Sequence, residues 1–321
     1  MSAQKPIVVV GSINTDLVAV TKRMPGVGET VIASEFQIHP GGKGANQAVA
    51  VARLGYPVRL IGRLGQDAFG AELRAHLHTA GVDITGVSNS DGVSGVAVVV
   101  VTERGDNSIL VAPGANSKVT PEDLDASISI LRSAGLVLAQ LEIPLETVEY
   151  LARICARENV PLILDPAPAM DLPPGIFKDI AWFTPNQTEA AFYLGNKYAD
   201  SSRRTPAELA QIFLSNGCRG VVLKMGANGT YLGSQGGIGS LVPAFSVDAI
   251  DTTAAGDAFN AGFATGLMLG KPPLDSAFFA AAVAAISVTR AGAQPSMPSM
   301  VEVEEFIKSE SLQVVREVAP R

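Results

Sequence analysis

The order of apolar segments predicts an α/β fold with a Rossmann-like, mostly parallel central sheet that helices cover on both faces. Short runs rich in β-branched residues, which are typical of buried strands, recur along the chain. Helical patterns lie between several of these runs, as in proteins built from alternating strands and helices. The expected strands are 7–10, 59–61, 95–101, 136–141, 162–165, 182–184 and 221–224, and the expected helices are 46–54, 69–80, 145–159 and 206–216.

Two segments interrupt the alternation and predict a small β-sheet lid from about residues 15–39 and 95–113. The first carries proline and glycine before an extended stretch at 30–38, and the second holds two β-rich pieces around a hairpin-like turn at 103–107. An ordinary antiparallel edge of the main sheet is the alternative. Because no repeat or low-complexity linker divides the sequence, we expect one domain over residues 1–321.

Composition narrows the class of protein. The 321 residues carry a net charge of −7, and the lysines and arginines are scattered, which disfavours nucleic acid as a partner. Cys155 and Cys218 form no CxxC pair, a pattern that suits a reducing compartment. The longest nearly continuous apolar run, at 277–286, is shorter than the roughly 20 residues of a membrane span, so it predicts a buried helix. We therefore expect a cytoplasmic protein without nucleic-acid or membrane partners.

A glycine-rich stretch at 40–47, PGGKGANQ, leads into a helical pattern. Glycines at such a junction let the backbone approach a ligand closely. Lys43 offers a positive charge, and Asn46 offers both a donor and an acceptor for hydroxyl groups. The stretch is not a Walker A loop, since no GxxxxGK precedes a serine or threonine, and no GxGxxG follows the first strand.

Polar residues follow several expected strands, where ligands bind in open α/β sheets. Asn14 and Asp16 come after the first strand, Glu142 ends the strand at 136–141, and Asp165 ends the strand at 162–165. Each one alone is also compatible with an ordinary turn or helix cap.

The stretch DTTAAGD at 251–257 places small residues before an apolar run, as at a helix N-terminus. Such a terminus has unpaired amides and the positive end of the helix dipole, so it attracts anions. Asp257 is then either a capping carboxylate or a group that acts beside a bound phosphate.

GGKGANQA at 41–48 and DTTAAGDAFNAG at 251–262 resemble the two signature motifs of the ribokinase-like carbohydrate kinase family. GSINTD near the N-terminus, the internal NQTE and the later TRAGAQPS are also similar to the family, so the resemblance runs from about Ile7 to about Ser296. It implies ATP-dependent phosphorylation of the primary hydroxyl of D-ribose to D-ribose 5-phosphate.

The resemblance also implies roles for individual residues. Asp257 would be the base that accepts the proton of the sugar hydroxyl, and the amides of Ala254, Ala255, Gly256 and Asp257 would form an anion hole for the transferred phosphoryl group. The sugar hydroxyls would be held by Asn14, Asp16, Gly42, Lys43, Asn46 and Glu142.

For ATP and Mg²⁺, the family's NxxE motif corresponds to Asn186 and Glu189, which would act largely through water. A helix-start carboxylate is the alternative for Glu189. Lys224, Gly226 and Gly229, together with Gly256, would border the nucleotide, although a small hydroxyl residue is expected in place of Lys224. A polar residue is common near the adenine in the family, but Ala281 stands there, so we expect apolar adenine contacts.

The resemblance further implies a K⁺ site near the anion hole, much of it formed by backbone carbonyls. Its residues would be Asp251, Thr253, Ser287, Arg290, Gly292 and Ser296. Family members of this type are often dimers through such a lid, and a second copy would cover the lid's strand edges, so we expect a homodimer.

Other functions remain open at this stage. Within the family, the substrate could be deoxyribose, fructose or a nucleoside, although Asn14 favours ribose. A sugar-binding or sensing protein that lost catalysis would not need Asp257 and the small residues before it. A nicotinamide-dependent dehydrogenase is disfavoured because GxGxxG is absent.

Overall fold

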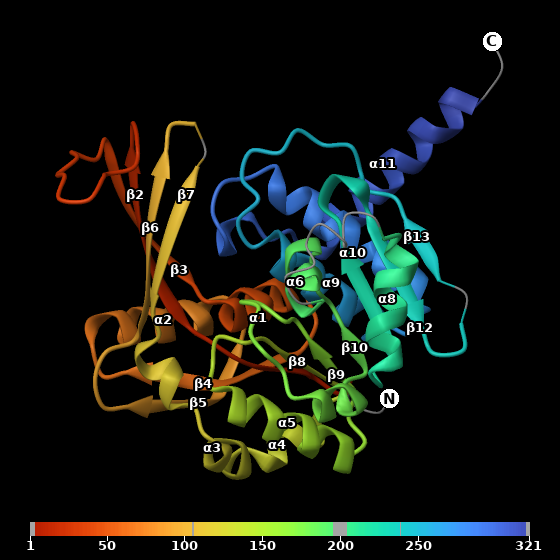
Figure 1. Ribbon diagram of the computed structural model, residues 1–321, viewed down its shortest axis with the longest axis horizontal. Coiled ribbons are helices and arrows are strands. Elements are labelled where there is room, and N and C mark those ends of the chain that lie inside the picture. Colours follow the sequence, from red (N-terminus) through yellow and green to blue (C-terminus); the bar gives the residue numbers. More distant parts are fainter. Residues whose placement is uncertain (1–3, 105, 195–203, 238, 319–321) are drawn as a thin grey trace.

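The structure is a computed structural model of the chain, and it describes residues 4–104, 106–194, 204–237 and 239–318. Figure 1 shows a body of strands between helices, with a smaller group of strands rising from one side of it. Within the described residues, nine strands form the central sheet: β1 (Ile7–Val10), β4 (Val58–Gly65), β5 (Asp83–Ser90), β8 (Leu136–Ala139), β9 (Leu162–Leu164), β10 (Trp182–Phe183), β11 (Gly220–Lys224), β12 (Thr230–Ser234) and β13 (Ser240–Val242).

The central sheet has the strand order β13-β12-β11-β10-β9-β8-β1-β4-β5. All neighbours from β5 to β11 are parallel, and only β12 and β13 pair antiparallel at one end. The sequence prediction of a mostly parallel sheet is therefore confirmed. Strand β5 was not predicted, because its sequence DITGVSNS has no apolar run.

Helices cover both faces of the sheet, as predicted. In β1, Ile7 and Val9 belong to one buried apolar cluster, and Val8 and Val10 belong to the other. This alternation follows from the two-residue period of a strand. The first cluster includes α1 (Lys43–Arg53), α2 (Ala68–Thr79), α9 (Ala255–Met268), α10 (Pro273–Val288) and α11 (Met300–Val318), and the second includes α3 (Pro121–Ala126), α4 (Ile128–Ser133), α5 (Leu145–Arg157), α6 (Gln187–Tyr193) and α8 (Pro206–Ser215).

The lid is a separate four-stranded sheet rather than an edge of the main sheet. Its order is β3-β2-β6-β7, formed by β2 (Asn14–Thr21), β3 (Glu35–Gly41), β6 (Gly95–Thr102) and β7 (Asn107–Ala112). Strands β2 and β6 are parallel, and the other pairs are antiparallel. The expected extended stretch at 30–38 begins only at Glu35, because Val20 of β2 is the last residue that pairs with β3 and Ile32 is 91% exposed.

The apolar run at 277–286 lies inside α10, which packs against α9, so the predicted buried helix is confirmed. Across the described part of the chain, we find no helix with the length and apolar content needed to cross a membrane. The remaining helical turns are short and of the 3₁₀ type: η1 (Gly114–Lys118), η2 (Pro174–Asp179), η3 (Gly226–Asn228) and η4 (Gln294–Ser296).

Candidate active site

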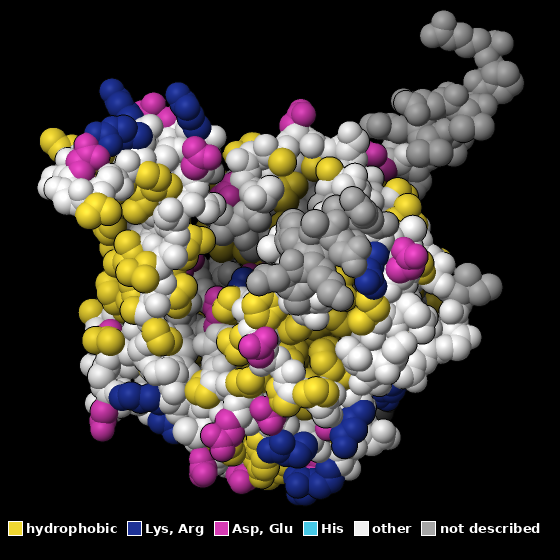
Figure 2. Space-filling view, viewed as in Figure 1, with side chains coloured by type: hydrophobic (Ala, Val, Ile, Leu, Met, Phe, Trp, Pro, Cys, Tyr) yellow, Lys and Arg dark blue, Asp and Glu magenta, His cyan; other side chains and the backbone are white. Residues whose placement is uncertain are grey.

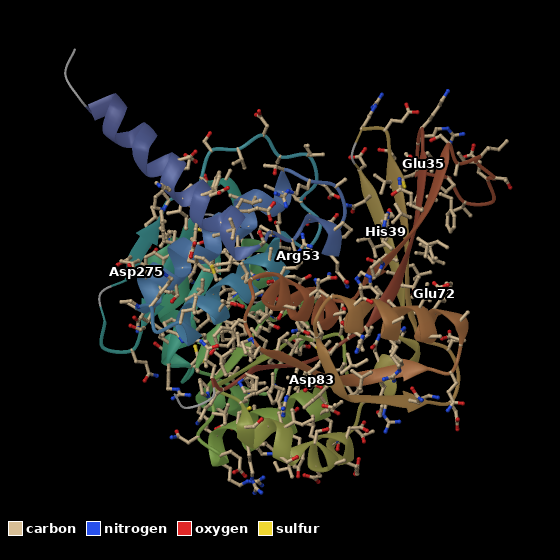
Figure 3. All side chains as sticks on the ribbon, turned by 180° about the vertical axis from the view of Figure 1, so that it is seen from behind. Glu35, His39, Arg53, Glu72, Asp83 and Asp275 are labelled. Carbon is tan, nitrogen blue, oxygen red and sulfur yellow. The ribbon has the colours of Figure 1, made fainter. Side chains whose placement is uncertain are left out.

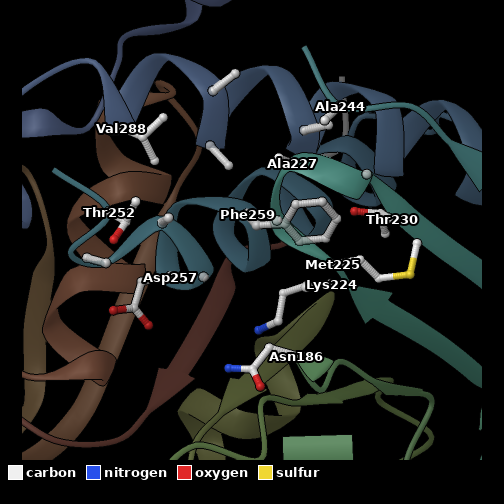
Figure 4. A pocket seen from close by; sticks show the side chains of 18 of the residues that line it. Asn186, Lys224, Met225, Ala227, Thr230, Ala244, Thr252, Asp257, Phe259 and Val288 are labelled. Atoms are coloured by element: carbon white, nitrogen blue, oxygen red, sulfur yellow. The ribbon is translucent and has the colours of Figure 1, made fainter. Parts of the chain in front are cut away.

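A cavity of about 550 Å³ lies beyond the carboxyl ends of β9 and β11, where the N-termini of α1 and α9 meet (Figure 4). Ligands bind in this position in open α/β sheets. Its charged and amide-bearing lining residues are Lys43, Asp165, Asn186, Glu189, Lys224 and Asp257. The cavity therefore collects side chains from segments far apart in the sequence.

The start of α1 depends on glycine at position 42. Gly42 has a φ of 86°, and a Cβ added there would lie 2.7 Å from the backbone nitrogen of Asn14. Only glycine adopts this backbone without strain and leaves room for the neighbouring chain. Helix α1 then begins at Lys43, whose backbone amide donates to Glu142 Oε2 at 3.1 Å. Ser12 Oγ donates to the same oxygen at 2.5 Å, so the glycine-rich loop is fixed to the end of β8.

Lys43 keeps a positive charge in the centre of the site. Burial alone would lower the pKa of Lys43, but several carboxylates, led by Asp257 and Glu142, outweigh burial and raise the pKa. An ammonium group among carboxylates is the arrangement expected where an anionic ligand is to be neutralised.

Asp257 lies in the first turn of α9 with 4% of its surface exposed. Two amide side chains from α1 hold its carboxylate: Asn46 Nδ2 donates to Oδ2 at 3.0 Å, and Gln47 Nε2 donates to Oδ1 at 3.0 Å. Burial raises the pKa of Asp257 to about 6, although Lys43 acts in the opposite direction. The group is ionised at neutral pH and close enough to its pKa to accept a proton.

The backbone in front of Asp257 has an unusual conformation. Ala254 has a φ of 58°, in the left-handed region that non-glycine residues rarely adopt. The Ala255 amide donates to Thr252 O at 3.2 Å, whereas, among the hydrogen bonds of the described residues, no protein acceptor faces the amides of Gly256 and Asp257. Two free amides thus lie at the positive end of α9, next to the buried carboxylate.

The lid contributes Asn14 and Asp16 at the start of β2. Burial and the nearby carboxylates of Glu142 and Asp257 raise the pKa of Asp16 to about 6. Asn14 Oδ1 accepts from Asn116 Nδ2 at 2.7 Å, which leaves the Asn14 amide group free to donate.

A chain of polar contacts joins the two sides of the site. Gln47 Nε2, which donates to Asp257, also lies 3.2 Å from Asp165 Oδ2. Asp165 Oδ1 accepts from Lys224 Nζ at 2.9 Å, and only 12% of the Lys224 side chain is exposed. Gln140 Nε2 donates to Gln47 Oε1 at 2.7 Å, which fixes the orientation of the Gln47 amide. The position of Lys224 is therefore tied to that of the buried carboxylate.

Asn186 and Glu189 form a reciprocal cap at the start of α6. Glu189 N donates to Asn186 Oδ1 at 2.8 Å, and Asn186 N donates to Glu189 Oε2 at 2.7 Å. Both residues also line the cavity, and burial raises the pKa of Glu189. The capping and ligand-facing interpretations are therefore compatible, since a carboxylate has lone pairs beyond those used by the cap.

The far end of the cavity is apolar. Ala281 lies on its wall, and Gly226 and Gly229 lie at the turn after β11 with φ values of 57° and 84°. Besides Ala281, the apolar lining includes Met225, Ala244, Phe245, Val247, Ala249, Phe259, Ala284, Ala285 and Val288.

Asp251 joins the loop before α9 to the loop after α10. Its carboxylate accepts the Thr253 amide at 2.9 Å and the Gly292 amide at 2.8 Å. The hydroxyls of Ser287 and Ser296 donate to backbone carbonyls, and the Arg290 side chain pairs with Glu302. Each oxygen of the Asp251 carboxylate accepts one amide and keeps a further lone pair, so the carboxylate can also ligate a cation. Among the described residues, no group of three or more His, Cys, Asp or Glu forms a metal cluster.

Known proteins are similar to this chain in fold and in sequence. Residues 4–300 match the model of the pfkB family carbohydrate kinases. The chain belongs to that family. This carbohydrate kinase is 41% identical over 306 residues to the ribokinase of Schizosaccharomyces pombe, an alignment that covers 93% of this chain and 96% of the relative.

Solved structures agree with this assignment. The crystal structure of ribokinase from Thermotoga maritima has a TM-score of 0.87 and 38% identity, and covers 94% of this kinase and 99% of that chain. The structure of Arabidopsis thaliana ribokinase complexed with ribose and ATP has a TM-score of 0.84 and 35% identity, and covers 95% and 99% of the two chains.

In this carbohydrate kinase, the predicted catalytic and nucleotide residues and Lys43 line the cavity, and Asn46 and Glu142 hydrogen-bond to lining residues. Asp16 interacts electrostatically with Lys43 and Asp257, Gly42 precedes Lys43, and Asn14 is bonded to Asn116, so these three residues lie outside the cavity lining. The predicted cation residues form the neighbouring loop pair instead. Ser12, Gln47, Asn116 and Gln140, which hold the functional side chains in place, were not predicted, and Asp165 was predicted only as a polar residue at a strand end. Asp165 carried a usable signal, since it ends a strand as Glu142 was expected to do.

Proposed function

We propose that this carbohydrate kinase transfers the γ-phosphoryl group of ATP to the primary hydroxyl of D-ribose and forms D-ribose 5-phosphate. The observation that carries the proposal is the buried Asp257 carboxylate beside the free amides of Gly256 and Asp257. The relatives named ribokinase, and the relative that was solved with ribose and ATP, support both substrates.

In this proposal, ribose binds between the lid and the start of α1. Carboxylates suit vicinal hydroxyls, and the site offers Asp16 from the lid and Glu142 from the end of β8. The full set of sugar-binding residues is Asn14, Asp16, Gly42, Lys43, Asn46, Glu142 and Asp257. The lid supplies Asn14 and Asp16, so closure of the lid over the sugar completes the binding site and excludes water.

Asp257 acts as the base. The primary hydroxyl of ribose gives its proton to the Asp257 carboxylate, and its oxygen bonds to the γ-phosphorus as the bond to the β–γ bridging oxygen breaks, releasing ADP. The amides of Ala254 to Asp257 face the charge on the transferred group, with Gly256 and Asp257 free to donate in this conformation. Lys43 neutralises part of the same charge.

The nucleotide occupies the apolar end of the cavity, with its phosphates toward Lys224, Gly226, Gly229 and Gly256. Lys224 Nζ lies close to the start of α9, because a Cβ added at Gly256 would be 3.5 Å from it. A phosphate bound by the amides of α9 would therefore also contact the Lys224 ammonium group. The carboxylate of Glu189 and the amide of Asn186 fit a magnesium ion that keeps most of its waters. Bound Mg²⁺ would supply charge neutralisation on the phosphates.

The loop pair around Asp251 holds a potassium ion in this proposal. Asp251, whose carboxylate joins the two loops, contributes that carboxylate. The other proposed ligands, which act mainly through backbone oxygens, are Thr253, Ser287, Arg290, Gly292 and Ser296. The loop leads directly into α9, so an ion there would stabilise the backbone that presents the free amides.

One domain, residues 1–321, carries the reaction, and its lid serves as the interface of a homodimer. The outer strand β7 is exposed at every residue, and Leu110 on it is 71% exposed. Figure 2 shows hydrophobic side chains gathered on the lid. A second copy would cover this apolar surface and the free edge of β7. We place the protein in the cytoplasm, which suits its two unpaired, buried cysteines.

The test is release of ADP from Mg-ATP with D-ribose, with and without K⁺, for the native protein and for Asp257→Ala. We expect ribose-dependent turnover that K⁺ raises and that falls by roughly a thousandfold in the variant, the range of a lost general base. Asp275→Ala, an exposed aspartate labelled in Figure 3, is the matched control. Turnover with deoxyribose, fructose or a nucleoside but not with ribose would show that the kinase acts on that compound instead. Ribose binding without any turnover would indicate a sugar sensor.

A further inference from the structure

A line of hydrogen bonds runs from the surface of α2 to the buried carboxylate. His76 Nε2 lies 2.8 Å from Gln294 Oε1. Gln294 Nε2 donates to Asn46 Oδ1 at 3.1 Å, and Asn46 Nδ2 donates to Asp257 Oδ2 at 3.0 Å. Gln294, Asn46 and Asp257 are buried, whereas His76 is exposed. Four segments that are distant in the sequence are thus joined end to end.

The direction of every bond in this line follows from one charge. An ionised carboxylate only accepts hydrogen bonds, so Asn46 must present its amide nitrogen to Asp257 and its oxygen to Gln294. Gln294 must then donate to Asn46, which leaves its own oxygen facing His76. Because that oxygen cannot donate, His76 must carry a hydrogen on Nε2. All three donors point toward the active site.

We propose that Gln294 is a positioning residue for the kinase reaction, and that His76 fixes its orientation from outside. Gln294 acts through Asn46: by donating to the Asn46 oxygen, it holds the Asn46 amide in the orientation that the Asp257 carboxylate requires, with the second Nδ2 hydrogen left for the sugar. A reversed Asn46 amide would direct its oxygen at the carboxylate, which would repel it, and would offer ribose the wrong hydrogen-bonding group. The proposal deepens the proposed function and rests on it.

The surface end of the line opens on a second cavity of about 190 Å³ between the lid and α2. His39 from β3 and Glu72 from α2 line this cavity with His76, and Figure 3 shows His39 and Glu72 at the base of the lid. His76 therefore stands where solvent reaches it, while Gln294 is held inside by the turn η4. At the inner end of the line, the charge of Lys43 lowers the pKa of Asp257 and the charge of Asp165 raises it.

The main test is a double-mutant cycle between Gln294→Met and Asn46→Ala. Methionine keeps the length of glutamine but can neither donate nor accept the two bonds. In the native background, we expect Gln294→Met to lower kcat/KM for ribose about fivefold, the usual worth of one hydrogen bond, with KM for ATP unchanged. In the Asn46→Ala background, the same substitution should change kcat/KM less than twofold, because the group it orients is gone.

The pH profile of kcat is a second readout that a merely structural role would not move. The Asn46 donor lowers the pKa of Asp257, so losing it raises that pKa. The reaction needs the ionised carboxylate, so the acid limb should move to higher pH by about half a unit in Gln294→Met. An equal loss in both backgrounds of the cycle, or an unmoved acid limb, would overturn the proposal.

Substitutions at the exposed end test the line without touching the core. His76→Phe removes the donor to Gln294, and we expect a loss of about twofold, whereas His76→Gln keeps a donor and should retain native activity. His78→Phe, an exposed histidine on the same helix outside the line, is the matched control. A loss in His78→Phe equal to that in His76→Phe would contradict the proposal.

The tautomer of His76 can be measured without an activity assay. Nitrogen-15 NMR at about pH 8 distinguishes which ring nitrogen carries the hydrogen, and we expect Nε2 in the native protein and loss of this preference in Gln294→Met. Hydrogen on Nδ1 alone would refute the direction of the line. If the native protein lacks ribose turnover but shows the Nε2 form, the proposed substrate fails and the hydrogen-bonded line stands.

Discussion

At the lid end of the active-site cavity the side chains are charged or carry amides, and most are already hydrogen-bonded to one another. The end between α9 and α10 is lined mainly by alanine, valine and phenylalanine. Asp16 and Ala281 represent the two ends. Asp16, which interacts with Lys43 and Asp257 at the lid end, is a carboxylate whose pKa burial raises, and Ala281 places a methyl group on the helix wall of the cavity.

The difference indicates which substrate the site selects most sharply. A site built to hydrogen-bond hydroxyls rejects analogues that lack them, because its buried polar groups would then lose their partners. An apolar wall discriminates much less, since one added or missing group changes binding by a modest factor. We therefore expect strict recognition of the sugar and looser recognition of the nucleotide base.

Asp16→Asn tests the polar end and should have the largest effect. The amide lacks the negative charge that strengthens hydrogen bonds to sugar hydroxyls, so kcat/KM for ribose should fall about a hundredfold, with KM for ATP unchanged. Steady-state kinetics with each substrate varied in turn measures both values. An equal rise of both KM values would mean that the two ends are not independent.

The pH dependence of the reaction should also report the polar end. Asp16 and Asp257 both have a pKa raised to about 6, and both must be ionised, so activity is present above pH 6 and lost as the pH falls below it. We expect log kcat/KM for ribose to fall with a slope approaching two below pH 6, which is about a hundredfold at pH 5. The slope should drop to one in Asp16→Asn, and a profile that stays flat to pH 5 would contradict these pKa values.

Lys224→Met tests the boundary between the two ends. Loss of the ammonium group that faces the phosphates should raise KM for ATP about tenfold and leave KM for ribose unchanged. The substitution also leaves Asp165 buried without its partner, which destabilises the fold. The double variant Lys224→Met with Asp165→Asn is the matched control: we expect it to recover melting temperature but not ATP affinity.

Ala281→Ser tests the apolar end and should have the smallest effect. A hydroxyl added to an apolar wall changes binding only slightly, so KM for ATP should stay within about twofold of the native value. Isothermal titration with ATP measures the dissociation constant without turnover, and this constant should also stay within about twofold. A tenfold change in either direction would show that this wall recognises the base closely.

Much of this arrangement could be predicted from sequence. The predicted strands, helices and lid segments lie close to their observed positions, because buried strands and amphipathic helices carry strong apolar patterns. Lys43 and Asp257, from the two sequence motifs, line the same cavity. Strand β5 was missed because its pairing with β4, rather than its own composition, makes it a strand.

The supporting residues could not be predicted in the same way. Gln47 and Gln140 look like ordinary residues of a helix and a strand end, and their role comes from hydrogen bonds across large sequence separations. Gln294 lies 248 residues after the asparagine that it orients. Such contacts depend on how the elements pack, which local patterns do not specify.

The left-handed backbone of Ala254 has a consequence for how this fold could be improved. A left-handed alanine costs roughly 1–2 kcal/mol, which glycine would avoid, although glycine also gives a more flexible unfolded chain. Ala254→Gly is thus expected to make the protein somewhat more stable. The same change would loosen the backbone that aims the amides of Gly256 and Asp257. Position 254 is therefore a site of stability–activity trade-off, where thermostability and turnover select opposite residues.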